Sequence, residues 1–457
     1  MTKKFFVLIL TNVFLFICAY KLRIKNYDII PVKGQSVDEY SNTWVGLSLI
    51  KLGMPVGISG LGGYKENYYR YVNVDRIFQN GEAVDGSPMP LNYPWFDHPP
   101  AMGLVTGAWA YFKGAEVFED TVTLLIRKPM VILGSVSVVL LFLLVYINYD
   151  YRTAFVSGLV YAIFPFGVVS SRMIQAENGL IPISLLTLIF FSLYSKRQKS
   201  IYWWLMSIMS GLAILFKLSG IYIFLTVVLL LVIDYKKYEK GFIDLLVIFV
   251  VVNFSILSAF VIYGYFYDWN QFVSVLKSNA DRVYGIGFNS LINLISQSRL
   301  TMTKFLSDPY WIFGWISFLV CIKKLKKHKL LIVSLLSYLC VYIFFGSQPY
   351  GWYTFPFIPY LTAFFGIVFR SKNNLLKLLI NLSIMGFYLD KLFLAQGIIL
   401  NLWRFLVPLL IVAGIVFGIR RRQKGFEVLN YGYLVLNIIL TLQYLSLFNV
   451  DYWYKVN

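Results

Sequence analysis

Long apolar runs recur along this chain, and they constrain its fold more than any other feature of the sequence. A helix that crosses the core of a bilayer needs roughly 17 to 25 predominantly apolar residues, and such runs follow one another as far as residue 449. They do not alternate polar and apolar residues as the strands of an outer-membrane barrel do. With 58% of the residues hydrophobic, a soluble core could not bury so much apolar surface. The sequence therefore predicts an all-α, polytopic membrane protein.

We expect about thirteen spanning helices in a single transmembrane domain, 1–457. The first covers Phe5 to Ala19 and stays uncleaved, because no small-residue cleavage site follows it. The later runs lie near 127–147, 153–170, 177–194, 201–216, 219–233, 242–265, 310–322, 330–346, 355–369, 374–394, 399–419 and 428–449.

The basic loops decide whether 101–114, a short stretch rich in Gly and Ala, crosses the membrane. Positive charges gather in cytoplasmic loops. If this stretch does not span, the dense basic clusters all become cytoplasmic; they lie at 148–152, 196–199, 236–237, 323–327, 370–377 and 420–424. We therefore expect a juxtamembrane or re-entrant helix at 101–114. The net charge of +19 then reflects topology beside anionic lipid and does not indicate nucleic-acid binding.

This topology leaves two long outer loops, at 21–126 and 266–309. In the first, the apolar residues of Tyr40–Ile50 recur at helical spacing, which predicts an amphipathic helix lying on the bilayer. In the second, we expect one short helix around Phe272–Leu276 and another from Leu291 to Phe305. The chain has no Walker loop and no GxGxxG motif after a strand, so nothing indicates a nucleotide-binding site.

Two acidic motifs in the first outer loop are candidate catalytic groups. Asp38-Glu39 precedes an apolar-periodic run, where an acid is an ordinary helix start; a carboxylate there could equally accept a proton from an attacking hydroxyl. Asp97-His98 stands before two prolines that suit the start of a helix, but the prolines do not explain the Asp-His pair. One histidine near scattered acids is a weak metal signal. A divalent cation therefore stays an open alternative, and the pattern requires no cofactor.

A second group of candidates falls at the outer ends of spans or in the second outer loop. Snorkelling, loop charge or an interfacial aromatic belt would explain each of them singly. Cations and tyrosine hydroxyls at headgroup depth could also bind the phosphate of an anionic lipid. The residues are Arg172, Glu177, Lys217, Arg299, Tyr350 and Tyr353.

The order of these motifs resembles that of the GT-C membrane glycosyltransferases. The bacterial branch with the protein O-mannosyltransferase-like enzymes and the lipid A aminoarabinose transferases is the nearest match. The resemblance covers residue 1 to about 370 and rests on five segments: Asp38-Glu39-Tyr40, Phe96-Asp97-His98-Pro99-Pro100, Arg172 before an acid, Gly211–Lys217 and Tyr353–Pro359. Two features depart from the pattern. The acid after Arg172 is Glu177 where relatives usually carry aspartate, and the large extramembrane domain of eukaryotic protein mannosyltransferases is missing.

The resemblance implies an enzyme that uses a polyprenyl-phosphate-linked sugar and inverts its anomeric centre. It makes Asp38 the general base or an acceptor-orienting carboxylate, supported by Glu39, with Asp97 and His98 completing the floor of the site. Lys217, Arg172 and Tyr353 would bind the donor phosphate, and we add Arg299 and Tyr350 to that set. The expected location is the cell inner or plasma membrane, with the site facing outward and meeting membrane lipid.

Two other functions remain open from the sequence. A glycan ligase or polymerase shares outward polar loops and lipid-linked substrates, and would transfer whole chains. A transporter or flippase would need ionisable groups in the middle of its spans, where this chain has few. The sugar and the extracytoplasmic acceptor, which could be a lipid, a glycan or a protein, are not identified by the sequence.

Overall fold

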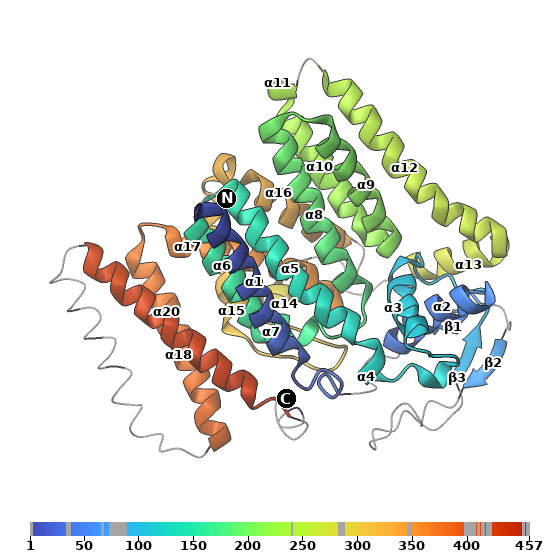
Figure 1. Ribbon diagram of the computed structural model, residues 1–457, viewed down its shortest axis with the longest axis horizontal. Coiled ribbons are helices and arrows are strands. Elements are labelled where there is room, and N and C mark those ends of the chain that lie inside the picture. Colours follow the sequence, from blue (N-terminus) through green and yellow to red (C-terminus); the bar gives the residue numbers. More distant parts are fainter. Residues whose placement is uncertain are drawn as a thin grey trace.

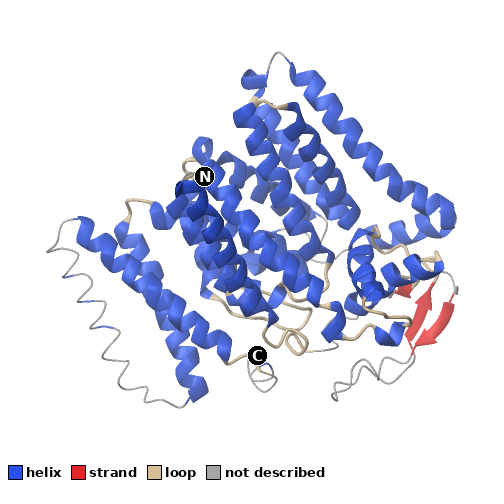
Figure 2. Ribbon diagram, viewed as in Figure 1, coloured by secondary structure: helices blue, strands red, loops and turns tan. Residues whose placement is uncertain are grey.

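The computed structural model describes residues 3–32, 38–64, 68–72, 89–238, 241–281, 288–344, 350–396 and 423–449, with single residues at 408, 412, 416 and 453. Long helices form a bundle, and a small sheet with several short helices lies at one end of it (Figures 1 and 2). The longer or site-bearing helices are α1 (Lys3–Ile24), α2 (Asp38–Leu52), α3 (Ala101–Phe112), α5 (Lys128–Asn148), α6 (Tyr151–Ile163), α7 (Pro165–Ser170), α8 (Ala176–Arg197), α9 (Ser200–Phe216), α10 (Ile221–Ile233), α12 (Phe242–Tyr267), α13 (Trp269–Ala280), α14 (Phe288–Ser296), α15 (Pro309–Ile322), α16 (Leu325–Phe344), α17 (Ile358–Arg370), α18 (Asn374–Gln396) and α20 (Gln423–Ser446). The shorter elements are α4 (Thr123–Ile126), α11 (Tyr235–Tyr238), the 3-10 helices η1 (Phe118–Asp120), η2 (Leu218–Gly220) and η4 (Gly351–Phe357), and strands β1 (Gly57–Ile58), β2 (Tyr68–Val72) and β3 (Met89–Asn92).

The described helices confirm a polytopic α-helical membrane protein. Seven of the described segments are long and apolar enough to cross a bilayer: Lys4–Ile24, Thr123–Asn148, Ala176–Arg197, Phe242–Tyr267, Leu325–Phe344, Gly351–Arg370 and Gly425–Ser446. Other predicted runs form shorter apolar helices, such as Ser200–Phe216 and Pro309–Ile322. The predicted run at 399–419 lies almost wholly outside the described residues. The count of thirteen spans therefore stays a prediction.

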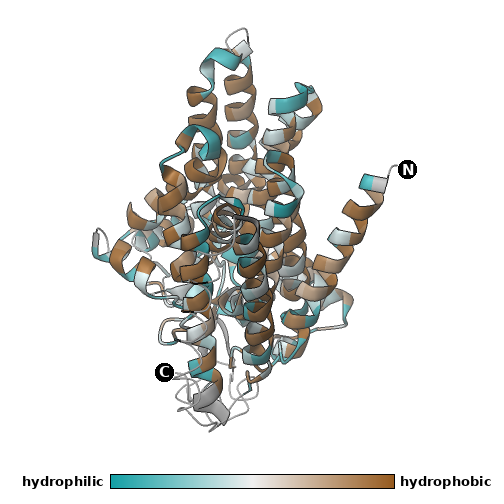
Figure 3. Ribbon diagram, turned by 90° about the vertical axis from the view of Figure 1, so that its left-hand side faces the viewer, coloured by the Kyte–Doolittle hydropathy of each residue, from teal (hydrophilic) through white to brown (hydrophobic). Residues whose placement is uncertain are grey.

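Polar residues collect at the two ends of the bundle, and apolar residues cover the helices between them (Figure 3). At one end, called here the basic end, contacts join connections that are far apart in sequence: Lys329 with Asp234, Arg370 with Asp150, and Lys196 with the carbonyl of Ile147. The opposite end carries the small sheet and is called the sheet end. The predicted basic loops that the structure describes thus meet at one end of the bundle.

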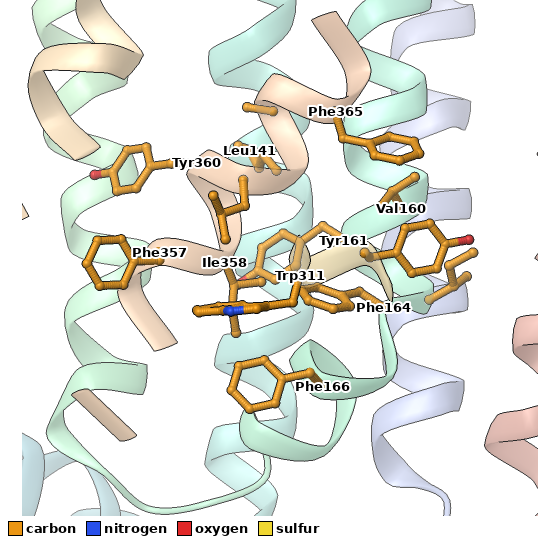
Figure 4. Close-up of a cluster of buried hydrophobic side chains, with 14 of the residues drawn as sticks. Leu141, Val160, Tyr161, Phe164, Phe166, Trp311, Phe357, Ile358, Tyr360 and Phe365 are labelled. Atoms are coloured by element: carbon orange, nitrogen blue, oxygen red, sulfur yellow. The ribbon is translucent and has the colours of Figure 1, made fainter. Parts of the chain in front are cut away.

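Aromatic and branched side chains fill the centre of the bundle. Figure 4 shows Trp311 of α15 packed among three side chains from other segments. Phe164 lies between α6 and α7, Phe166 belongs to α7 and Ile358 begins α17. The Trp311 and Phe166 rings meet edge to face, with centroids 5.3 Å apart. Interlocking rings of this kind fix the helices relative to one another. They hold the ends of α7, α15 and η4 together at the sheet end.

Helix α2 differs from the predicted surface helix. Its residues from Glu39 to Ser48 are all buried, so no face of this stretch lies on the bilayer. Close packing on α3 explains the burial: a Cβ at Gly46 would lie 1.8 Å from the carbonyl oxygen of Gly103. Three hydroxyl groups of α2 hydrogen bond within the protein: Ser41 Oγ accepts from Ile58 N and donates to its carbonyl, Thr43 Oγ1 donates to the Glu39 carbonyl, and Ser48 Oγ donates to the Val45 carbonyl. The amphipathic prediction was therefore wrong for this helix.

The first loop also contains a small antiparallel sheet that the sequence analysis did not predict. Its strand order is β1-β3-β2, and Gly57 pairs with Asn92 while Tyr71 pairs with Pro90. The strands are two to five residues long, too short for their alternation to stand out. Helix α3, with twelve residues, is about 18 Å long and too short to cross a bilayer core of about 30 Å. This agrees with the expected juxtamembrane role of 101–114.

The second loop bears out one expected helix and changes the other. Helix α13 is present and contains Phe272 and Val275 on its buried side. Helix α14 ends at Ser296, and the chain then turns back in a hairpin in which Arg299 bridges Phe305. The Thr301 hydroxyl accepts the backbone N–H of Lys304, and this hydrogen bond closes the turn. Threonine hydroxyls that bond to nearby backbone groups compete with the hydrogen bonds of a helix. The predicted helix from 291 to 305 therefore stops nine residues early.

Candidate active site

A buried ion pair links two transmembrane elements at the sheet end. Lys217 Nζ hydrogen bonds to Glu177 Oε1, and the side-chain exposures are 6% and 0%. The same ammonium stands 3.7 Å from the centre of the Tyr353 ring. Taking a charge out of water is costly unless a partner compensates it, so the carboxylate and the ring face together account for the buried cation. Lys217 and Tyr353, two of the predicted phosphate-binding residues, therefore meet in space, and Glu177 lies beside them.

Local breaks in helices place these three groups. Lys217 follows α9 in extended conformation (φ −160°, ψ 142°), and η2 folds back so closely that a Cβ at Gly220 would lie 2.3 Å from the Ala213 carbonyl oxygen. Glu177 lies in the first turn of α8, where the helix dipole favours an acid. Tyr353 belongs to η4, and its carbonyl accepts the Tyr338 hydroxyl at 2.7 Å. Lys217 therefore lies where α9 stops and Glu177 where α8 starts, while Tyr353 lies in the short 3-10 helix that precedes α17.

The hairpin after α14 brings Arg299 beside this cluster. The Arg299 guanidinium lies 4.6 Å from the centre of the Phe305 ring, and the Arg299 carbonyl lies against η4, where a Cβ at Gly351 would come within 2.6 Å of it. Tyr350 precedes η4 and stacks at a tilt on Tyr353, with centroids 6.0 Å apart. The predicted phosphate-binding residues Lys217, Tyr353, Tyr350 and Arg299 thus lie in neighbouring segments.

Asp97 is the centre of a second polar cluster in the first loop. Its carboxylate accepts the Ser59 hydroxyl at 2.7 and 2.9 Å and the Tyr64 hydroxyl at 2.6 Å. Burial first, and then the Asp97 charge, raise the pKa of Tyr64 well above its ordinary value, so this phenol stays a donor. Asn279 on α13 holds the Asp97 carbonyl through a 2.8 Å hydrogen bond. His98 is half-buried and meets the Trp95 ring edge to face at 6.0 Å.

Helix α13 fixes the loop that carries these donors. Gln271 Nε2 and Ser274 Oγ donate to the Gly63 carbonyl at 3.0 and 2.9 Å. A Cβ at Gly63 would lie 2.7 Å from the carbonyl oxygen of Ser274, so only glycine permits this approach. Helix α13 therefore positions the loop of Ser59 and Tyr64 beside Asp97.

Asp38 and Glu39 begin α2 but have different surroundings. Asp38 is exposed. Glu39 is 1% exposed and forms a bidentate pair with Arg127, at 2.7 Å from Nε and 2.8 Å from Nη2. Arg127 Nη1 also donates to the carbonyls of Tyr27 and Pro31. Glu39 thus anchors the start of α2 to the start of α5.

Arg172 also makes contacts within the protein fold. Its guanidinium donates to the carbonyls of Arg23, Ile30 and Leu22 at 3.0 to 3.1 Å. Helix ends leave carbonyls without intrahelical partners, and Arg172 satisfies those at the end of α1. This geometry ties α1 to the α7–α8 turn and leaves fewer donors for a phosphate.

Apolar packing joins the two polar clusters. Tyr40, Met102, Ala176 and the partly buried Phe216 belong to one hydrophobic cluster. Tyr40 is two residues from Asp38, while Ala176 and Phe216 directly precede Glu177 and Lys217. The start of α2, the start of α3 and the Lys217–Glu177 pair therefore flank one another at the sheet end.

Sequence reasoning missed three residues that shape the site: Arg127, Ser59 and Asn279. Arg127 looked like an ordinary charge at the start of a span, and the other two are common polar residues of the outer segments. The acidic residues could have indicated that such partners exist, because a buried carboxylate needs hydrogen-bond donors. Among the described residues, no group of three or more His, Cys, Asp or Glu side chains could hold a metal ion.

Comparisons with known proteins bear on the fold of the chain. The family described as dolichyl-phosphate-mannose-protein mannosyltransferase matches residues 97–262. The structure of ArnT from Cupriavidus metallidurans bound to undecaprenyl phosphate superposes with a TM-score of 0.54 and 15% identity, over 94% of this chain and 76% of that one. The chain has a GT-C fold. No curated protein sequence matches.

A second similar structure with a GT-C fold belongs to a longer chain. It is the archaeal oligosaccharyltransferase AglB from Archaeoglobus fulgidus in complex with an inhibitory peptide and a dolichol-phosphate. The TM-score is 0.52 at 12% identity, over 98% of this chain and 56% of that one. The GT-C chain described here thus spans little more than half of AglB, and the resemblance to GT-C glycosyltransferases drawn from the sequence is confirmed for the fold.

Proposed function

We propose that this GT-C protein is an inverting glycosyltransferase that moves a sugar from a polyprenyl-phosphate-linked donor to an extracytoplasmic acceptor. The observation that carries the proposal is the Lys217 ammonium, which Glu177 holds over Tyr353. It lies at the end of the bundle that carries the loop with Asp38 and Asp97. Support comes from the two similar structures, whose bound lipids are undecaprenyl phosphate and dolichol-phosphate.

The leaving phosphate is assigned to Lys217, Arg299, Tyr350 and Tyr353. When the bond from the anomeric carbon to the phosphate oxygen breaks, the bonding electrons go to that oxygen and the polyprenyl phosphate gains charge. Cations preorganised in a site with little water stabilise this charge in the transition state. Arg172 has a different part in the proposal: it stabilises the end of α1, because its donors already serve three carbonyls.

The acceptor side is assigned to Asp38 and Asp97. Asp38 is exposed at the start of α2 and takes the proton from the attacking acceptor hydroxyl as the new carbon–oxygen bond forms. A carboxylate near the anomeric carbon also favours the oxocarbenium-like transition state. Asp97, oriented by Ser59 and Tyr64, and His98 contribute to the floor. A polyprenyl-linked donor reaches the site from within the bilayer, which suits a site at the sheet end of the helical bundle.

A paired variant tests the phosphate assignment without leaving a buried charge. Lys217→Met alone leaves the Glu177 carboxylate buried without a countercharge. This destabilises the folded protein by about 3–5 kcal/mol, so folding and activity would fall together. In the double variant Lys217→Met/Glu177→Gln, neutral groups of similar volume replace the pair, and folding is expected to recover. Release of polyprenyl phosphate from a sugar-charged lipid should stay about 10²–10³-fold below wild type.

The matched control is the exposed pair between Lys51 and Glu116, 3.7 Å apart in the first loop. Lys51→Met/Glu116→Gln should keep full activity, because exposed pairs contribute about 0–1 kcal/mol. A folded Lys217→Met/Glu177→Gln protein with wild-type turnover would refute the phosphate role. Translocation of intact sugar lipid with no released polyprenyl phosphate would identify a flippase, and transfer of whole glycan chains would identify a ligase.

A further inference from the structure

A cavity of about 350 Å³ lies outside the candidate active site, between the α14–α15 connection and α18. Its walls combine two kinds of side chain. Three half-buried or exposed rings, Phe305, Phe313 and Phe387, form the apolar part. Exposed polar groups, Gln297, Ser307 and Ser383, form the rim. Binding sites for small organic groups commonly have roughly this size and this combination.

The chemistry of the walls favours an uncharged sugar. The C–H face of a pyranose packs on aromatic rings, and its hydroxyls pair with serine hydroxyls and a glutamine amide, which both donate and accept. The described residues that line the cavity include no lysine or arginine. Asp308 is also in the wall, and its carboxylate accepts the backbone N–H groups of Phe166 and Tyr310 at 2.9 and 3.0 Å. An anionic group such as a phosphate would find no countercharge among these described lining residues and would lie beside the Asp308 carboxyl group.

The cavity shares a wall with the candidate active site. The Phe305 ring lines the cavity and lies under the Arg299 guanidinium at 4.6 Å. The carbonyls of Arg299 and Leu300, on the same hairpin, lie against Gly351 of η4, the element that carries Tyr353. The same hairpin therefore lies between the cavity and the proposed phosphate-binding residues. A sugar in the cavity would be close to the transfer reaction.

We propose that this cavity binds an uncharged sugar unit of a membrane-borne acceptor glycan. The membrane-borne character follows from Ile312, which lines the cavity on α15 and is 44% exposed on a helix that continues into the apolar part of the bundle. The assignment of the sugar to an acceptor rests on the proposed function. Sugar binding in the cavity does not rest on that function, so sugar binding and the acceptor role are tested separately.

Photolabelling tests the cavity itself. The full chain in lipid nanodiscs is labelled with a photoreactive dodecyl maltoside and, as the matched probe, with a photoreactive dodecylphosphocholine of the same chain length. The maltoside should label peptides from 296–313 and 383–387 about tenfold more strongly than the phosphocholine, equivalent to about 1.4 kcal/mol. Ser383→Phe, which fills the cavity from an exposed position on α18, should remove this difference. Ser258→Phe, at an exposed position on α12 across the molecule (Figure 1), should leave it unchanged.

Three outcomes would overturn the sugar site: equal labelling by both probes, which would indicate a lipid-tail groove; no labelling of these peptides; or labelling that Ser383→Phe does not reduce. A second measurement tests the acceptor role. Ser383→Phe should lower transfer to endogenous membrane glycans while acceptor-free release of polyprenyl phosphate to water stays at the wild-type rate. If both fall together, the cavity is not an acceptor site. If the maltoside labels the cavity but no release occurs in any variant, the sugar site stands and the glycosyltransferase proposal fails.

Discussion

At the scale of single residues, side chains that are neighbours in the sequence have different surroundings in this protein. Asp38 and Glu39 form one sequence motif, yet Glu39 is buried against Arg127 while Asp38 is exposed. Arg172 and Lys217 both seemed placed for a phosphate, yet Arg172 binds three carbonyls of α1 and its following turn. The sequence could indicate which residues were unusual in an apolar chain. Which partner each one meets depends on segments far away along the chain.

Asp38→Asn should leave the fold intact and lower transfer by about 10²–10⁴-fold. Asparagine starts a helix as well as aspartate does, so the loss would come from the missing base. Turnover of a sugar-charged polyprenyl phosphate and protein yield are measured together. Glu116→Gln, at an exposed carboxylate of the same loop, is the control and should be fully active. Near wild-type transfer by Asp38→Asn would remove Asp38 from the base role.

Asp308 should make stability depend on pH. Burial raises its pKa from 3.8 to about 7. Because the folded state then holds a proton that the unfolded chain releases, the stability that Asp308 contributes is fully present below about pH 4 and is lost as the pH rises to about 7. The change is on the order of 4 kcal/mol, at 1.36 kcal/mol per pKa unit. Thermal unfolding in detergent at pH 4, 5.5 and 7 measures it. Asp308→Asn should flatten this profile, and an unchanged slope would contradict the assignment.

At the scale of elements, helix boundaries were more predictable than the surroundings of the helices. The apolar runs located α5, α8, α9 and α12 within a few residues, because transfer into a bilayer depends on local length and composition. The expected exposure of α2 was wrong, since its glycine and small polar residues pack against α3. The hairpin at 298–306 replaced a predicted helix, because a side-chain hydroxyl closes a turn there. Both differences arise from contacts outside the segment itself.

Gly46→Ala should separate α2 from α3 and destabilise the first loop. The added methyl group would meet the Gly103 carbonyl at 1.8 Å, and such overpacking costs about 1–3 kcal/mol or more. The measurement is the unfolding temperature together with transfer activity, because α2 begins at Asp38. Gly60→Ala, where a Cβ meets nothing within 4 Å, serves as the control. A fully stable and active Gly46→Ala protein would show that the two helices do not depend on this close approach.

At the scale of the whole molecule, the chain has two chemically different ends. The basic end contains Lys196, Arg370 and Lys329, while the sheet end contains the candidate active site. By the positive-inside rule, we expect the basic end to lie in the cytoplasm. On this expectation, we propose that the candidate site faces outward from the inner or plasma membrane. This orientation was the premise of the functional argument from the sequence.

Accessibility of single cysteines tests the orientation. After Cys18, Cys321 and Cys340 are replaced by serine, Glu116→Cys should react with a membrane-impermeant maleimide added outside intact cells, and Arg152→Cys should react only after the cells are opened. Both positions are exposed, so a difference reports sidedness and not burial. The reverse pattern would place the Asp38 loop in the cytoplasm and exclude an extracytoplasmic acceptor.

The sequence by itself determined the polytopic helical class, the places where most helices run and the set of polar residues that an apolar chain does not need for solubility. These properties follow from local composition, because the bilayer selects length and hydrophobicity segment by segment. The tertiary structure alone decided that Glu177 pairs with Lys217, 40 residues away, that Glu39 and Arg127 meet across 88 residues, and that a hairpin separates the ion pair from a cavity. Partner choice depends on long-range packing and on satisfying each buried charge, and no local window of sequence contains that information.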